Sequence, residues 1–230
     1  MFDLSFDIER NITRLAVAFI PMLLGMVLHE LAHGYTAYRL GDPTAKLQGR
    51  LTLNPVAHLD MTGSLLFLFT ALASPIIFGW AKPVQVQPRY FRNPRKGMML
   101  VSVAGPAANF ALALVFGGVY AVLLNQALTG GMEMTKTTEF LLRTTSMGIW
   151  INIILGWFNL LPLPSLDGGH ILAGLLPPNL AYKFYSLSRY GLIILAVLLA
   201  SGLLRHVLGP LARTSLDIVG AIFSIPPKFL

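Results

Sequence analysis

The sequence predicts an all-α polytopic membrane protein with about five to six membrane helices. Hydrophobic residues make up 55% of the 230 positions and charged residues only 12%, about half the charged share of an average soluble chain. The mean hydropathy of +0.67 is correspondingly high, and several uncharged runs approach the length of a bilayer span. The net charge of +7 therefore fits basic cytoplasmic loops, and nucleic-acid binding is not expected.

Spanning helices need about 20 mostly apolar residues, and the expected segments follow that rule. The segment 207–230 contains Arg213 and Asp217 and is expected to be interfacial or weakly spanning. The first ten residues carry three acidic side chains against Arg10, so a cleavable signal peptide is not expected. The predicted membrane segments are 12–38, 61–81, 97–124, 144–166 and 190–204.

Two polar stretches between these segments predict short membrane-associated β-strands near the active site. Residues 47–60 alternate around Leu51 to Leu53, and residues 82–87 read KPVQVQ, an alternation typical of a half-exposed strand. An exposed strand edge could hold an unwound peptide by β-addition, which we expect at 51–54 or 84–87. A basic cluster follows at 89–96 and is expected to face anionic lipid headgroups.

The most informative motif is His29-Glu30-Leu31-Ala32-His33, inside the first apolar segment. On a helix, residues four apart share a face, so both imidazoles can reach one cation. Two histidines at this spacing with a glutamate between them as general base form the core of many zinc hydrolases. Ionisable residues within a membrane segment are costly and usually mark function. The alternative is a chance arrangement.

A catalytic zinc ion takes three protein ligands and a water molecule, so a third ligand is required. Asp167 has the best context, because the prolines before it end a helix and the glycine pair after it permits a tight fold. The alternative is a turn or N-cap aspartate. With no cysteine in the chain, thiolate ligands, disulfides and a cysteine nucleophile are excluded. The other candidates are Asp42, His58, Asp60, His170 and His206.

Three motifs resemble the signatures of the site-2 proteases, a family of intramembrane zinc metalloproteases. They are HELAH at 29–33, GPAAN at 105–109 and NLLPLPSLDGGH at 159–170, in the order found in that family. The resemblance covers well over half of the chain. The chain resembles the short, minimal branch of the family, because no PDZ insertion interrupts it and no CBS domain follows.

The resemblance implies one zinc ion per chain, bound by His29, His33 and Asp167, with Glu30 activating the attacking water. It implies that Asn159 binds the substrate backbone, and it places Asn109 in a polar role at the same site. Either asparagine could donate a hydrogen bond to the developing oxyanion, or could serve in hydrogen bonding between helices.

The topology must bring His33 and Asp167 to one metal at the same depth. This works if 61–81 is re-entrant or a hairpin, because three full crossings would place the two residues near opposite faces. The glycines and prolines of 61–81 favour a broken element. The basic loops at 39–50 and 82–96 are both expected to be cytoplasmic, which places the active site nearer that face.

The sequence therefore predicts a single metalloprotease domain over 1–230, with a core at 12–170 and C-terminal membrane segments within 184–226. The expected partners are a transmembrane protein substrate and the lipid bilayer, and the expected location is a prokaryotic plasma (inner) membrane. Two alternatives stay open, a divalent-metal transporter and a non-catalytic relative that binds membrane helices. The absence of an internal repeat speaks against a transporter.

Overall fold

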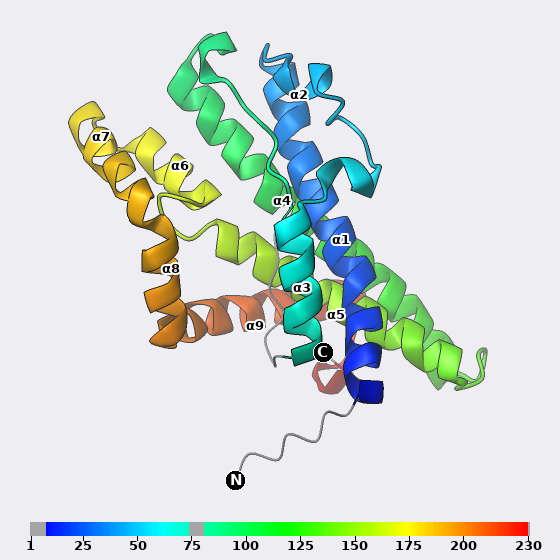
Figure 1. Ribbon diagram of the computed structural model, residues 1–230. Coiled ribbons are helices and arrows are strands. Elements are labelled where there is room, and N and C mark those ends of the chain that lie inside the picture. The colour runs from blue at the N-terminus through cyan, green and yellow to red at the C-terminus, as the bar shows by residue number, and fades with distance from the viewer. Residues whose placement is uncertain (1–7, 74–80, 230) are drawn as a thin grey trace.

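The computed structural model describes residues 8–73 and 81–229, which are almost entirely helical (Figure 1). Short 3-10 helices, labelled η, connect several of the α-helices. In chain order the elements are α1 (Ile8–Arg39), α2 (Thr44–Leu47), η1 (Pro55–His58), α3 (Met61–Ala73), η2 (Pro88–Tyr90), α4 (Pro94–Leu128), α5 (Lys136–Asn159), α6 (Asp167–Leu175), α7 (Pro178–Ser186), η3 (Leu187–Tyr190), α8 (Gly191–Ala200), α9 (Leu203–Phe223) and η4 (Pro227–Phe229).

Three long helices form the centre of the molecule, with α4 running antiparallel to both α1 and α5 (Figure 1). Glycines on α5 bring it close to α4. A Cβ atom on Gly148 would lie 2.6 Å from the Phe116 ring, and one on Gly156 would lie 2.7 Å from the Phe110 ring. Small residues of this kind allow two helices to approach closely within a membrane.

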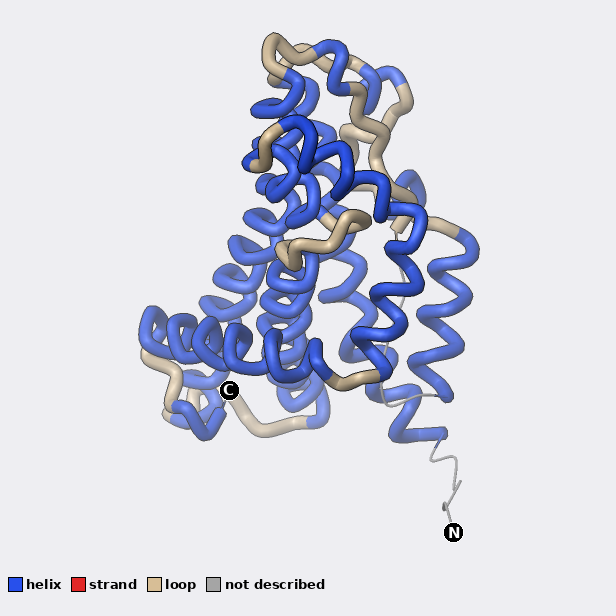
Figure 2. Tube along the Cα trace, turned by 90° about the vertical axis from the view of Figure 1, so that its left-hand side faces the viewer, coloured by secondary structure: helices blue, strands red, loops and turns tan. Residues whose placement is uncertain are grey.

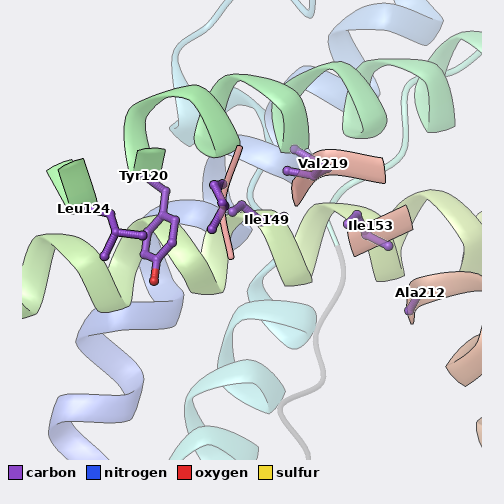
Figure 3. Packing of buried hydrophobic residues seen from close by; sticks show 8 residues of the cluster. Tyr120, Leu124, Ile149, Ile153, Ala212 and Val219 are labelled. Carbon is purple, nitrogen blue, oxygen red and sulfur yellow. The ribbon is translucent and has the colours of Figure 1, made fainter. Parts of the chain in front are cut away.

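The buried hydrophobic core lies where α9 crosses α4 and α5. Figure 2 shows α9 lying across one end of the long helices, and Figure 3 shows the side chains that meet there. Ile149 and Ile153 of α5 are almost fully buried against Ala212 and Val219 of α9. The hydroxyl of Tyr120 on α4 donates to the carbonyl of Phe229 at 2.9 Å, which fixes the C-terminal turn against this core.

The expected five to six membrane helices are not confirmed. Within the described residues, Ile12–Arg39 and Pro94–Leu128 are long and apolar enough to cross a bilayer. A third span is possible if Pro178–Tyr190 and Ile193–Ala200, which meet at a 72° bend, count as one. The helix α3 has 13 residues, too few for a span of about 20. In α5, charged side chains at Lys136, Glu139 and Arg143 shorten the apolar part.

The predicted β-strands are wrong for the part of the chain that the structure describes, which contains one isolated bridge between Leu59 and Ala81. Residues 51–54 do not pair with another strand, because Asn54 caps η1 by accepting a hydrogen bond from the Val56 amide at 3.1 Å. Residues 82–87 form no strand either. Three of their amides donate to the His58 carbonyl of η1 and to the side chains of Glu30 and Asp42.

Both ends of the 61–81 segment lie side by side, as a hairpin requires. Leu59 bridges Ala81 in antiparallel fashion, and the Lys82 amide donates to the His58 carbonyl at 2.8 Å. Residues 74–80 lie outside the described residues. The chain therefore enters and leaves the 61–81 segment at neighbouring positions. This arrangement allows α1 and α6 to meet at one site.

Candidate metal centre

His29 and His33 occupy one face of α1 and point toward α4. Both are buried, and their Nε2 atoms lie 2.9 Å apart. The rings stand edge to face, with centroids 4.5 Å apart. The spacing of four residues along the helix produces this pairing, as the motif predicts.

Asp167 completes a group of three ligand atoms from distant parts of the chain. It is the first residue of α6, and its Oδ2 lies 3.2 Å from the Nε2 of each histidine. The glycine pair that follows lets α6 begin here. A Cβ on Gly168 would collide with the Leu160 carbonyl, and a Cβ on Gly169 with the Leu163 carbonyl. The first turn of α6 therefore packs directly on the bend that follows α5.

The hydrogen bonds behind the two imidazoles fix their tautomers. His33 Nδ1 lies 2.7 Å from the Val101 carbonyl, which can only accept, so this nitrogen carries the proton. His29 Nδ1 lies 2.7 Å from the Asn109 side-chain oxygen and is the donor for the same reason. With neutral rings, each Nε2 is then the nitrogen left to bind a cation on the side of Asp167. Such outer hydrogen bonds are the usual means of orienting metal-ligating histidines.

These three atoms fit a zinc ion. With neutral rings all three are acceptors, and Asp167 Oδ2 is buried without a hydrogen-bond donor, so a cation bound between them would relieve their repulsion. Tetrahedral ligands at about 2.0–2.1 Å from zinc lie about 3.3 Å apart, close to the 2.9–3.2 Å measured here. Two nitrogens and one carboxylate oxygen leave a fourth position open, as in catalytic zinc sites.

Gly105 of the GPAAN motif is what allows α4 to lie against the two imidazoles. A Cβ at this position would come within 2.5 Å of His33 Cε1 and Nε2 and within 2.6 Å of His29 Cε1. Real side chains do not approach that closely, so any other residue would displace the rings. The sequence showed Gly105 as part of the GPAAN motif, but it did not reveal that the two imidazole rings need the space beside it.

Asn109 lies one turn further along α4 and is fully buried. Its oxygen accepts from His29, and its amide donates to the Gly25 carbonyl and to the Asn152 oxygen, each at 3.1 Å. Asn152, also fully buried, donates to the Gly148 carbonyl at 2.9 Å. Both N–H groups of Asn109 are thus occupied within the helix bundle. Asn152 was not predicted, and its only signal was polarity within an apolar run.

Glu30 faces a different neighbour from the histidines. Its Oε2 accepts a hydrogen bond of 2.8 Å from the Val84 amide in the extended 82–87 segment, whereas its other oxygen has no hydrogen bond to the described residues. The carboxylate is half-buried. Glu30 is therefore held by one oxygen beside the ligand cluster, with the second available to water.

Asn159 ends α5, where its amide donates to the Leu155 carbonyl at 3.0 Å. The side chain is half-buried and makes no contact with the ligand cluster. The remaining third-ligand candidates also lie outside that cluster. Each has another partner: Thr44 and Gln87 for Asp42, Thr52 for His58, Gly63 for Asp60, Tyr185 for His170 and Gly202 for His206.

Known proteins with similar sequences agree with this geometry. Residues 17–199 match peptidase family M50. The chain belongs to that family. It is 42% identical to YwhC of Bacillus subtilis over 206 residues, which cover 89% of this chain and 90% of the relative. It is 31% identical to Rip2 of Mycolicibacterium smegmatis over 186 residues, or 80% of this chain and 66% of the relative.

A more distant relative is MJ0392 of Methanocaldococcus jannaschii, 26% identical over 179 residues, which are 78% of this chain and 40% of the relative. The relatives' names assign YwhC and Rip2 provisionally to the zinc metalloproteases, and that of MJ0392 does so outright. No solved structure matches the M50 chain. The predicted family and enzyme class, a zinc metalloprotease of the site-2 type, are confirmed.

Proposed function

We propose that this M50 protein is an intramembrane zinc endopeptidase that hydrolyses a peptide bond within or near the membrane-spanning segment of a protein substrate. The observation that carries the proposal is the meeting of three side chains that could hold a metal ion, His29, His33 and Asp167, with Glu30 next to His29 on the same helix. The ligands come from a helix long and apolar enough to span the bilayer and from the start of α6.

In this proposal His29, His33 and Asp167 hold one zinc ion. Zinc, when bound, polarises the scissile carbonyl and makes water a stronger nucleophile near neutral pH. Glu30 takes a proton from the attacking water through its free oxygen as the C–O bond forms. It then gives that proton to the amide nitrogen as the C–N bond breaks, so that the amine leaves neutral.

The two asparagines have separate roles in the proposal. Asn109 keeps His29 Nδ1 protonated and its ring in place, because both its N–H groups and its oxygen are already bound. Asn159, whose only hydrogen bond to the described residues is to its own helix, contacts the substrate backbone. The role of Asn109 is the hydrogen bonding between helices that the sequence left open as an alternative. The role of Asn159 is the one implied by the resemblance to the site-2 proteases.

An apolar groove between α1 and α3 supports a transmembrane substrate. It encloses about 770 Å³ and is lined almost wholly by hydrophobic side chains. Along α1 it extends from Ile12 to Met26, which lies one helical turn before Glu30. Pro55 and Leu59 line it as well. A membrane-embedded substrate segment lying here would lead directly to the catalytic base.

The proposed location is a prokaryotic plasma membrane, with the metal centre nearer the cytoplasmic face. The basic loops at 39–50 and 82–96 support this, since they lie at one end of the molecule (Figure 1). The Gln48 amide also donates to the Gln85 side chain between them, at 3.1 Å. Basic loops remain cytoplasmic. Cysteines introduced at 50 and 92 should label from the same side, and labelling from opposite sides would contradict the proposal.

The decisive experiment compares the wild type with Glu30→Gln in lipid bilayers. Both should contain one zinc ion per chain, because Glu30 is not a ligand, whereas cleavage of a model transmembrane peptide should fall by at least about 1,000-fold when the base is lost. Metal analysis and mass spectrometry of the products measure the two quantities. His33→Ala is the matched control and should lose zinc and cleavage together.

A companion variant tests the substrate contact in the same assay. Asn159→Ala should keep its zinc and raise KM, because it removes the proposed hydrogen bond to bound peptide and, within the described residues, only the bond to the Leu155 carbonyl of its own helix. A transporter would be indicated if Glu30→Gln left zinc flux across vesicles unchanged while the wild type cleaved no substrate. Lack of zinc in the wild-type protein would refute the proposed function outright.

A further inference from the structure

Asp42 is a buried carboxylate for which the proposed chemistry has no use. It lies three residues beyond the end of α1 and is fully buried. Oδ1 accepts hydrogen bonds from the Thr44 amide at 2.9 Å and from the Thr44 hydroxyl at 2.5 Å. Oδ2 accepts a bond of 2.7 Å from the Gln87 amide. Bonds to an ionised acceptor are about twice as strong as neutral ones, so Asp42 ties two loops firmly together.

The Gln87 amide belongs to the same extended segment that reaches Glu30. Three of its backbone donors are tied to other elements: Lys82 to the His58 carbonyl, Val84 to Glu30 and Gln87 to Asp42. The segment lacks the regular ladder that would hold a strand in a sheet. Its position beside the catalytic base therefore depends on these separate anchors, of which Asp42 and Glu30 are the charged ones.

Gly34, one turn after Glu30 on α1, provides the surface on which the segment lies. A Cβ there would be 2.9 Å from Leu51 Cδ2, 3.2 Å from the Ala45 Cβ and 3.3 Å from Val84 Cγ1. Val84 therefore lies directly against the helix. A small movement of the segment would take its amide away from Glu30.

We propose that Asp42 is a positioning residue for the catalytic base. It clamps Gln87, which keeps the Val84 amide on one oxygen of Glu30 and so directs the other oxygen toward the attacking water. This inference rests on the proposed function, since it concerns how the base of that reaction is held. A small rotation of the Glu30 side chain would move its free oxygen away from the attacking water. Displacement of a catalytic group by about 1 Å costs up to 100-fold in rate.

Asp42→Asn is the sharpest probe, because it keeps the shape of the side chain while it removes the charge and turns one acceptor into a donor. Oδ1 receives two donors from Thr44, so the amide oxygen of the variant takes that place. The new NH2 group then faces the Gln87 amide, donor against donor, and the clamp opens. Asp60→Asn is the matched control. Asp60 caps Gly63 at 2.9 Å, an acceptor role that asparagine fills equally well, and its side chain accepts no hydrogen bond from residues 82–87.

Two measurements test the clamp in purified, zinc-loaded protein. Amide hydrogen exchange in the peptide covering 82–90 should be faster in Asp42→Asn than in wild type and unchanged in Asp60→Asn. The kcat for a model transmembrane peptide should fall between about tenfold and 100-fold, with KM within about twofold and one zinc ion per chain retained. A merely structural role would lower zinc content or stability without this selective loss of kcat.

Val84→Pro provides a second route, because it removes the N–H that reaches Glu30. If Asp42 acts through Val84, the double variant should be no slower than Val84→Pro alone. Losses that multiply, or an Asp42→Asn enzyme with wild-type kcat, would overturn the proposal. Unchanged exchange at 82–90 would also overturn it. Exchange can be measured even if the wild type cleaves no peptide, an outcome that would instead count against the proposed function.

Discussion

The two faces of α1 at the HELAH motif are supported in different ways. His29 and His33 face α4, where helix backbone and buried asparagine side chains fix each ring. Glu30 faces the extended 82–87 segment, where a single backbone amide holds it. Metal ligands need fixed geometry, and a helix packed on a helix provides it. Glu30, the proposed base, is held instead by a segment whose own position depends on a few hydrogen bonds.

Adding one methyl group to the metal face should have the largest effect. Gly105→Ala would place a Cβ within 2.6 Å of both imidazoles, so the rings must turn away from Asp167. We expect a fall in zinc affinity of at least about 100-fold and loss of cleavage at low zinc. Competition with a chelator measures the affinity. Gly209→Ala in α9, where a Cβ meets nothing within 4 Å, is the control, and a normal zinc affinity in Gly105→Ala would contradict this account.

The same methyl group on the base face should leave the metal untouched. Gly34→Ala would push on Leu51 and Val84 but not on a ligand, so zinc content should stay at one per chain. The kcat should fall about threefold to tenfold as the Val84 amide moves away from Glu30. Steady-state kinetics beside metal analysis measure both quantities. If zinc were lost here as in Gly105→Ala, the two faces would not be independent.

The smallest effect is expected furthest from the metal. Asn152→Ala removes one partner of the Asn109 amide and leaves a buried donor unsatisfied, which costs about 1–3 kcal/mol of stability. Zinc affinity should fall only a few-fold, because the bond from His29 to Asn109 remains. At saturating zinc, kcat should equal that of the wild type. A loss of kcat under those conditions would show that Asn152 acts on more than the position of Asn109.

The sequence led to the candidate metal ligands more directly than to the fold. His29, His33 and Asp167, which the structure brings together as a possible metal site, each stood in a short motif with a recognisable chemistry. The helix count is not confirmed in the described residues, because apolar runs alone do not show that α3 has 13 residues or that Pro178–Tyr190 and Ile193–Ala200 meet at a 72° bend. The alternation at 82–87 was wrongly predicted to pair as a strand, because three of its amides donate to the His58 carbonyl, Glu30 and Asp42.

The contacts that support the site could not be predicted, since they join residues far apart in the chain. The Val101 carbonyl accepts a hydrogen bond from His33, and any residue at position 101 would offer the same carbonyl. Val84 reaches Glu30 through its amide, which side-chain identity does not reveal. Arg95 was expected to lie in a lipid-facing basic cluster, yet its guanidinium also donates to the Gly174 carbonyl at the end of α6, at 2.9 Å. Backbone partners leave little trace in a single sequence.

The chain contains no cysteine, yet a metal ion bound by His29, His33 and Asp167 would give it a cross-link. Such an ion, held between α1 and α6, would close a loop that includes α3, α4 and α5, and tying distant segments together restricts the unfolded chain most when the loop is long. Binding energy at such a site is also folding energy. A chelator should therefore do more than stop the proposed catalysis. It should also lower the stability of the folded protein, because it removes the link between α1 and α6.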